Sequence, residues 1–173
     1  MVETAVLVTF AFCMVFAAVS DLISMTIANR VSLLLVGAFV LFALIMGMPL
    51  TAIAMHVAAG AVVLAVAFAL FAFGGMGGGD AKLMAATAIW FGFNTALLEY
   101  LATTALLGGA LTLVLLAYRR SPLAAATASN PLLRHCADAR AGIPYGVALA
   151  IGGLLTYSQT PLSQWALARL SGA

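Results

Sequence analysis

The chain alternates long apolar runs with short polar breaks, and this pattern predicts helices that cross a membrane. The run 4–20 carries no charge and ends at Asp21, a polar connection leads to Arg30, and the runs 31–48 and 52–73 are separated by a turn at Pro49. Each run is close to the roughly 20 residues that a helix needs to cross the hydrocarbon core of a bilayer. The first half of the chain therefore predicts three membrane-spanning helices.

The second half contains an apolar stretch, 83–118, that is too long for one span. As a single helix it would be about 54 Å long, nearly twice the thickness of the hydrocarbon core. The breaker at 92–95 predicts a short fourth helix, from Asp80 or Ala81 to about Phe91, and a fifth helix from about Thr95 to Tyr118. A polar loop over 119–141, a sixth span over 142–157 and a tail complete the prediction.

We thus expect an all-α, polytopic integral membrane protein with six transmembrane helices and a single domain over 1–173. The composition agrees, since 65% of the residues are hydrophobic and 7% are charged, whereas about 25% are charged in soluble domains. A soluble globule is excluded. The net charge of +2 excludes a nucleic-acid-binding surface. Neither Cys13 nor Cys136 belongs to a CxxC pair, so the sequence predicts no metal site, and it predicts no cofactor.

The few charges report the topology. Six alternating spans place six of the seven basic residues on one side of the membrane: Arg30, Lys82, Arg119, Arg120, Arg134 and Arg140. By the positive-inside rule that side is the cytoplasm, which puts Arg169 and both termini outside. Because two spans separate Asp21 from Asp80, both carboxylates are expected to emerge at the cytoplasmic face.

A glycine-rich stretch, Gly74-Gly75-Met76-Gly77-Gly78-Gly79, leads directly into Asp80. Glycine lets other backbone approach closely, so this stretch predicts a shaped loop beside a reactive acid. Two carboxylates at one face can share a proton, as in aspartic proteases, with one activating water and the other protonating the scissile carbonyl. The helix dipole favours the charged form of Asp80 and disfavours that of Asp21. The alternative is that both acids are interfacial residues that merely flank helices.

These residues resemble a known family. The segment Gly77-Gly78-Gly79-Asp80 fits the G-x-G-D signature of membrane aspartic proteases, and the wider segment 75–83 resembles the short prepilin peptidases of Flp-type (tight adherence) pilus systems. The Asp at the end of the first helix, Asn29 after it, and the segment 143–148 at the start of the last helix also match that family's pattern. The resemblance extends over essentially the whole chain.

The resemblance implies that Asp21 and Asp80 are the catalytic pair and that Gly77 and Gly79 belong to the active-site loop. It implies a multi-pass protein of the bacterial inner membrane that cuts the leader from a membrane-inserted prepilin at the cytoplasmic face, just after a glycine. Contact with the pilus assembly machinery is a further expectation. The segment Ile27-Ala28-Asn29 departs from the family pattern, since it lacks the proline that would make this loop rigid. The sequence also has no paired CxxC motifs, which accompany methyltransferase activity in the longer prepilin peptidases, so we expect proteolysis only.

Several further residues are candidates for substrate contact or structural support. Lys82 lies about 200° round the helix from Asp80, so it is expected to anchor the helix at the lipid headgroups or to meet an acidic pilin residue, rather than to pair with Asp80. Asn29 is expected to cap the second helix. At the start of the sixth helix, Pro144 fits the first helical position, and Tyr145 and Gly146 are expected to pack near the site or touch the substrate.

Two other functions use the same features. A small proton- or ion-coupled transporter would also carry acids and broken helices within the membrane. A non-catalytic assembly subunit would keep the fold without needing the paired carboxylates. Against the transporter, both acids are expected at one face rather than at the midplane, and no inverted repeat is visible.

Overall fold

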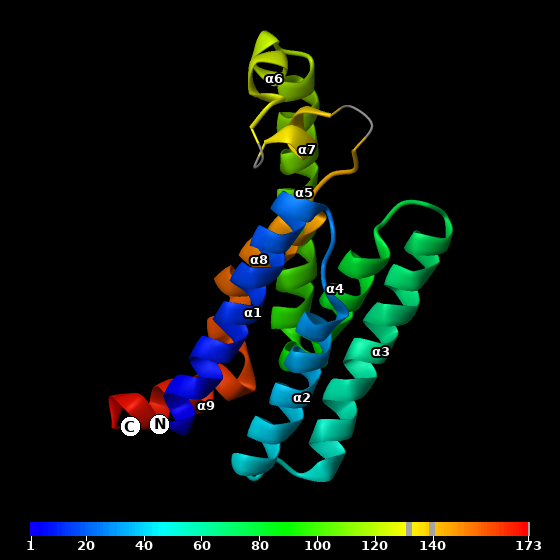
Figure 1. Cartoon of the computed structure of the whole chain (residues 1–173). Helices are drawn as coiled ribbons and strands as arrows, with labels where there is room; N and C mark the ends of the chain where they lie inside the picture. The colour runs from blue at the N-terminus through cyan, green and yellow to red at the C-terminus, as the bar shows by residue number, and fades with distance from the viewer. Residues whose placement is uncertain (131–132, 139–140, 173) are drawn as a thin grey trace.

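The computed structural model describes residues 1–130, 133–138 and 141–172 (Figure 1). All regular structure in this part of the chain is helical, which confirms the predicted all-α class. The elements in chain order are α1 (Val2–Ser24), α2 (Asn29–Ile45), α3 (Leu50–Ala72), α4 (Gly78–Phe91), α5 (Thr95–Arg119), α6 (Pro122–Thr127), α7 (Arg134–Ala137), α8 (Tyr145–Thr156), the 3-10 turn η1 (Tyr157–Gln159) and α9 (Pro161–Ser171).

Three helices in the described residues, α1, α3 and α5, are long and apolar enough to cross a membrane. The helix α2 is apolar but shorter. Many large apolar side chains on these helices face outward, such as Leu33, Phe68 and Leu113, which are 70%, 62% and 71% exposed. An apolar exterior of this kind suits a lipid environment.

The short helix α4 forms the centre of the bundle. It packs against α2, α3 and α8, and every residue from 85 to 91 is buried. The Trp90 indole is fully buried and its Nε1–H donates to the Leu35 carbonyl at 3.1 Å. Small residues allow this packing, since a Cβ added at Gly60 of α3 would lie 2.4 Å from Ile89 Cγ1. The helix that carries Asp80 is therefore held on several sides.

The predicted break between the fourth and fifth helices is confirmed. Gly92 ends α4 with a φ of +71°, a conformation that side chains rarely adopt, and the His56 ring lies directly beside it. Asn94 then caps α5, because its side-chain oxygen accepts a hydrogen bond from the Leu97 N–H at 3.0 Å.

Three boundaries differ from the prediction. The first helix was expected to end at Asp21, but α1 continues to Ser24 and ends with Met25 in the left-handed conformation. The Ser24 hydroxyl donates to the Ser20 carbonyl at 2.7 Å, so polar residues here extend the helix past the apolar run. The fourth helix starts at Gly78, before Asp80, and the sixth starts at Tyr145 rather than 142.

The predicted tail and polar loop are also partly helical. Thr160 caps α9 by accepting from the Ser163 N–H, Pro161 occupies the first turn, and Leu162 is buried where α9 packs on α1. The loop 119–141 contains α6 and α7, and Arg119, the last residue of α5, holds α7 by donating from its guanidinium to the Cys136 carbonyl at 3.0 Å. Pro131 and Arg140, which the prediction placed in this loop, lie outside the described residues.

Both termini lie near one end of the bundle, as does the turn between α2 and α3 (Figure 1). The last turn of α1, the start of α4 and the helices α6 and α7 lie toward the opposite end (Figure 1). The chain thus brings Asp21 and Asp80 toward the same end of the bundle, as expected for two residues separated by two spans.

Candidate active site

The first carboxylate, Asp21, lies in the last turn of α1 and is only 5% exposed. Its Oδ2 accepts a hydrogen bond of 2.7 Å from the backbone N–H of Gly146, in the first turn of α8. The first turn of a helix leaves backbone N–H groups without partners inside the helix, so it suits a negative charge. This contact fixes the Asp21 carboxylate in position.

The close approach of α8 to α1 depends on Gly146. A Cβ added at this position would lie 2.9 Å from Asp21 Oδ2 and 2.8 Å from Ile27 Cδ1. Both distances are shorter than real Cβ contacts allow, so any side chain here has to displace the carboxylate or the connection between α1 and α2. The role of Gly146 is therefore positional.

The second carboxylate, Asp80, is the third residue of α4 and follows the glycine-rich stretch. Its Oδ1 is buried, and it has no hydrogen-bond partner among the described residues. Gly77 precedes the helix at the N-cap, and a Cβ there would lie 2.6 Å from Asp80 Oδ2. A side chain at 77 would thus displace the second carboxylate.

The remaining glycines of this stretch serve two purposes. Gly74 turns the chain after α3 with a φ of +74°, the one positive φ among the glycines of this stretch. Gly79 instead allows close approach, because a Cβ there would lie 3.3 Å from the Cβ of Ile27. The start of α4 therefore packs against the connection between α1 and α2. Ile27 of this connection lines the site, and no pattern in the sequence pointed to that role.

Asp21 and Asp80 line one cavity of about 220 Å³, together with the connection 25–27, Asn29 and the glycines 77–79. The two carboxylates interact electrostatically. A cavity of this size holds several water molecules, each of which occupies about 30 Å³. The structure thus brings together the two acids singled out from the sequence, in a cavity with room for water. Their catalytic role stays a prediction.

The other candidates surround this cavity. Lys82 Nζ donates to Asn29 Oδ1 at 3.0 Å, so Lys82 links α4 to α2, and Asn29 is the first residue of α2 rather than its cap. The Tyr145 hydroxyl donates to the Thr104 carbonyl at 3.4 Å. Pro144 stands at the N-cap of α8, not at the first helical position as predicted.

Comparison with protein-family models decides the family. The model of the type IV leader peptidase family matches residues 8–116, which is more than half of the chain and includes both carboxylates and the glycine-rich stretch. The chain belongs to the type IV leader peptidase family. No curated protein and no solved structure matches it.

Membership of the type IV leader peptidase family confirms the resemblance to prepilin peptidases. Together with the long apolar helices it identifies a membrane protein of the peptidase class. The match ends before α8, so it does not cover the Gly146 contact with Asp21. That part of the site is defined by the geometry of this structure alone.

Proposed function

We propose that this leader peptidase family member is an aspartic endopeptidase that removes the leader from prepilins of the Flp type. The single observation that carries the proposal is the shared cavity of Asp21 and Asp80. Two interacting carboxylates in one partly enclosed space match the chemical requirement of an aspartic dyad. The family match favours a peptidase over the alternative of a small ion-coupled transporter.

In the proposed reaction the ionised carboxylate takes a proton from water, whose oxygen attacks the carbonyl carbon of the scissile peptide bond, while the other group, a protonated carboxylic acid, gives its proton to the carbonyl oxygen. Each acid has a source of stabilisation for negative charge. The Gly146 N–H donates to Asp21, and Asp80 lies in the first turn of α4, where the helix dipole favours an anion. Because two negative charges in one small cavity repel each other, we treat the pair as sharing one proton.

We place this reaction at the cytoplasmic face of the bacterial inner membrane, with α1–α5 and α8 as the six spans and both termini outside. The support is charge: Arg30, Lys82 and Arg119 belong to the end of the bundle that holds the site, whereas Arg169 belongs to α9 at the other end. Reporter fusions after Arg120 and after Ser158 should report opposite sides of the membrane. The same side for both would refute this topology.

We propose cleavage just after a glycine, before the hydrophobic helix of the pilin, and proteolysis without methylation, since the two cysteines of the chain form no CxxC motif. The test is co-expression with a candidate Flp-type prepilin, in which the size of the pilin is followed. Wild type should shorten the pilin by its leader, and the mature N-terminus should follow a glycine when sequenced. A pilin that keeps its full length with every Flp-type prepilin tried would refute the proposed substrate class.

A further inference from the structure

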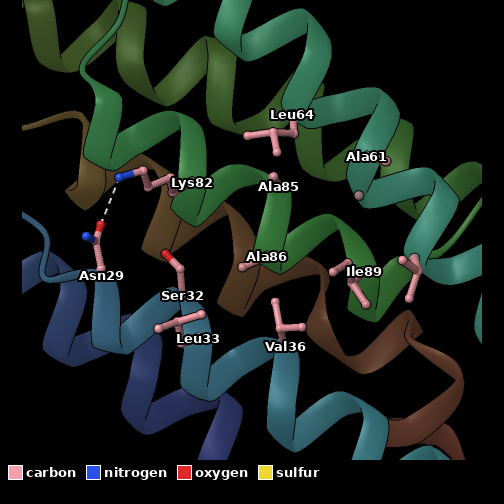
Figure 2. A pocket seen from close by; sticks show the side chains of 12 residues that line it. Asn29, Ser32, Leu33, Val36, Ala61, Leu64, Lys82, Ala85, Ala86 and Ile89 are labelled. Atoms are coloured by element: carbon pink, nitrogen blue, oxygen red, sulfur yellow. Dashed lines mark hydrogen bonds between the residues drawn. The ribbon is translucent and has the colours of Figure 1, made fainter.

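A second cavity, of about 480 Å³, opens between α2, α3 and α4 (Figure 2). Figure 2 shows Ala61 and Leu64 of α3 on one side, Val36 of α2 on another, and Ala85 and Ile89 of α4 between them. We refer to this cavity as the α2–α3–α4 groove. Its walls are aliphatic along most of their length, and its polar side chains gather at one end.

The groove lies next to the active-site cavity. Asn29 lines both spaces, and Lys82, which lines the groove, follows Asp80 by two residues in the same helix. From Lys82 to Ile89 the groove follows α4 for about 10 Å, which is two helical turns. A chain that leaves the carboxylates toward the membrane interior therefore has an apolar path directly beside it.

The wall of the groove contains an unsatisfied hydroxyl. Ser32 is 9% exposed, and its Oγ has no hydrogen-bond partner among the residues that the structure describes. In a helix a serine hydroxyl commonly donates to the carbonyl four residues earlier, and here it does not. A hydroxyl left unpaired in an apolar environment costs free energy. The Ser32 Oγ is itself covered by neighbouring atoms, so an occupant of the groove reaches it only if the wall moves.

A cation stands where the groove meets the active-site cavity. Lys82 is exposed, its hydrogen bond goes to the neutral Asn29, and no salt bridge to it is found in the described part of the chain. A lysine without an acidic partner at the mouth of an apolar groove complements an occupant that is apolar along its length and carries a carboxylate near this level.

We propose that the α2–α3–α4 groove binds the apolar transmembrane helix of the substrate, with the part nearest the cut beside Lys82. This is the binding mode in which one helix lies along a hydrophobic groove and is held by anchors at helical spacing. The inference rests on the proposed function, since it assigns the substrate segment on the membrane side of the cut. The position of the groove next to the catalytic cavity, with which it shares Asn29, favours a substrate over a phospholipid chain.

The first test is site-specific photo-crosslinking from two positions of α3. Leu64 lines the groove, whereas Val62 lines a separate apolar cleft between α3, α4 and α5, and the two side chains are 42% and 53% exposed. A photoreactive residue at 64 should crosslink to a membrane-inserted prepilin, both in the active protein and in the Asp80→Asn variant, and one at 62 should not. Equal crosslinking from both positions, or crosslinks from 64 to phospholipid alone, would overturn the proposal.

The second test fills the groove. Ala61 faces it and is exposed, so Ala61→Phe should fold normally and obstruct the substrate helix, and Val62→Phe is the matched control. We expect Ala61→Phe to lower kcat/KM for a membrane-inserted prepilin at least tenfold, mainly through KM, and Val62→Phe to leave it within twofold. Wild-type values for Ala61→Phe would sink the groove assignment while the proposed function stands. If the wild-type protein cuts no prepilin, the proposed function fails, and the groove assignment fails with it.

Discussion

Gly146→Ala tests whether the hydrogen bond from the Gly146 N–H holds the Asp21 carboxylate in its catalytic position. The added Cβ would lie 2.9 Å from Asp21 Oδ2 and 3.0 Å from Asp21 Cβ, so the carboxylate has to move away from the Gly146 N–H that now holds it at 2.7 Å. We expect the hydrogen bond to lengthen or break and the Asp21 carboxylate to leave its place opposite Asp80.

The magnitude follows from the charge on the acceptor. A hydrogen bond to a charged group contributes about 1.5–3 kcal/mol. Since about 1.4 kcal/mol corresponds to a tenfold change in rate, the loss of this contact at the transition state should lower kcat/KM by about 10- to 150-fold. Overpacking of a buried site costs about 1–3 kcal/mol in stability, so thermal unfolding in detergent has to be measured alongside.

Two further variants isolate the cause. Gly109→Ala is the matched control, since a Cβ at Gly109 of α5 meets nothing within 4 Å, and it should leave the rate of cleavage unchanged. The double variant Gly146→Ala/Ile27→Ala removes the other clash, the one with Ile27 Cδ1 at 2.8 Å. If the double variant regains wild-type activity, or if Gly146→Ala alone cleaves normally, the positional role of the Gly146 contact with Asp21 is refuted.

Three other substitutions test the frame around the site. Ala28→Pro should be tolerated and should raise stability by about 0.4–1 kcal/mol, because Ala28 already has a φ of −65°, the angle that proline imposes; a fall in the melting temperature would contradict this. Trp90→Phe should lower stability by about 1–3 kcal/mol through loss of the hydrogen bond to Leu35 and of buried volume, and no change would argue against the central packing of α4. Burial raises the pKa of the Cys136 thiol, so maleimide should label it slowly at neutral pH and faster as the pH rises. Arg119→Lys keeps a positive charge near the thiol but cannot reproduce the guanidinium's separate hydrogen bonds to the Cys136 and Gly142 carbonyls, so it should speed labelling, and an unchanged rate would refute the anchoring role of Arg119.

The helices could be predicted from the sequence to the extent that hydropathy and helix breakers define them. The break at 92–95 was clear because Gly92 and Asn94 are types that end and begin helices. The helix α9 was missed because Arg169 and several polar residues hide a short amphipathic pattern, although Thr160-Pro161 is a start signal that the sequence offered.

The site, too, was predictable only in part. The parity of the spans was enough to predict that Asp21 and Asp80 lie toward the same end of the bundle. The contact between Gly146 and Asp21 was not predictable, because it joins residues 125 positions apart and depends on how α8 packs against α1. The glycines of 74–79 were expected to allow close approach in a shaped loop, and Gly77 and Gly79 do so by making room for Asp80 and Ile27, while a positive φ occurs in this stretch only at Gly74.

Cleavage by purified protein in liposomes tests whether Asp21 and Asp80 act as one catalytic pair. A membrane-inserted prepilin would be incubated with the wild type, with Asp21→Asn and with Asp80→Asn, and Glu99→Gln would serve as the control that removes a carboxylate at the opposite end of the bundle, where it accepts from Gln159. If the two carboxylates act together, the wild type and Glu99→Gln should release the leader at similar rates and both Asp variants should release none. Cleavage by either Asp variant at a rate near that of the wild type would contradict this pairing.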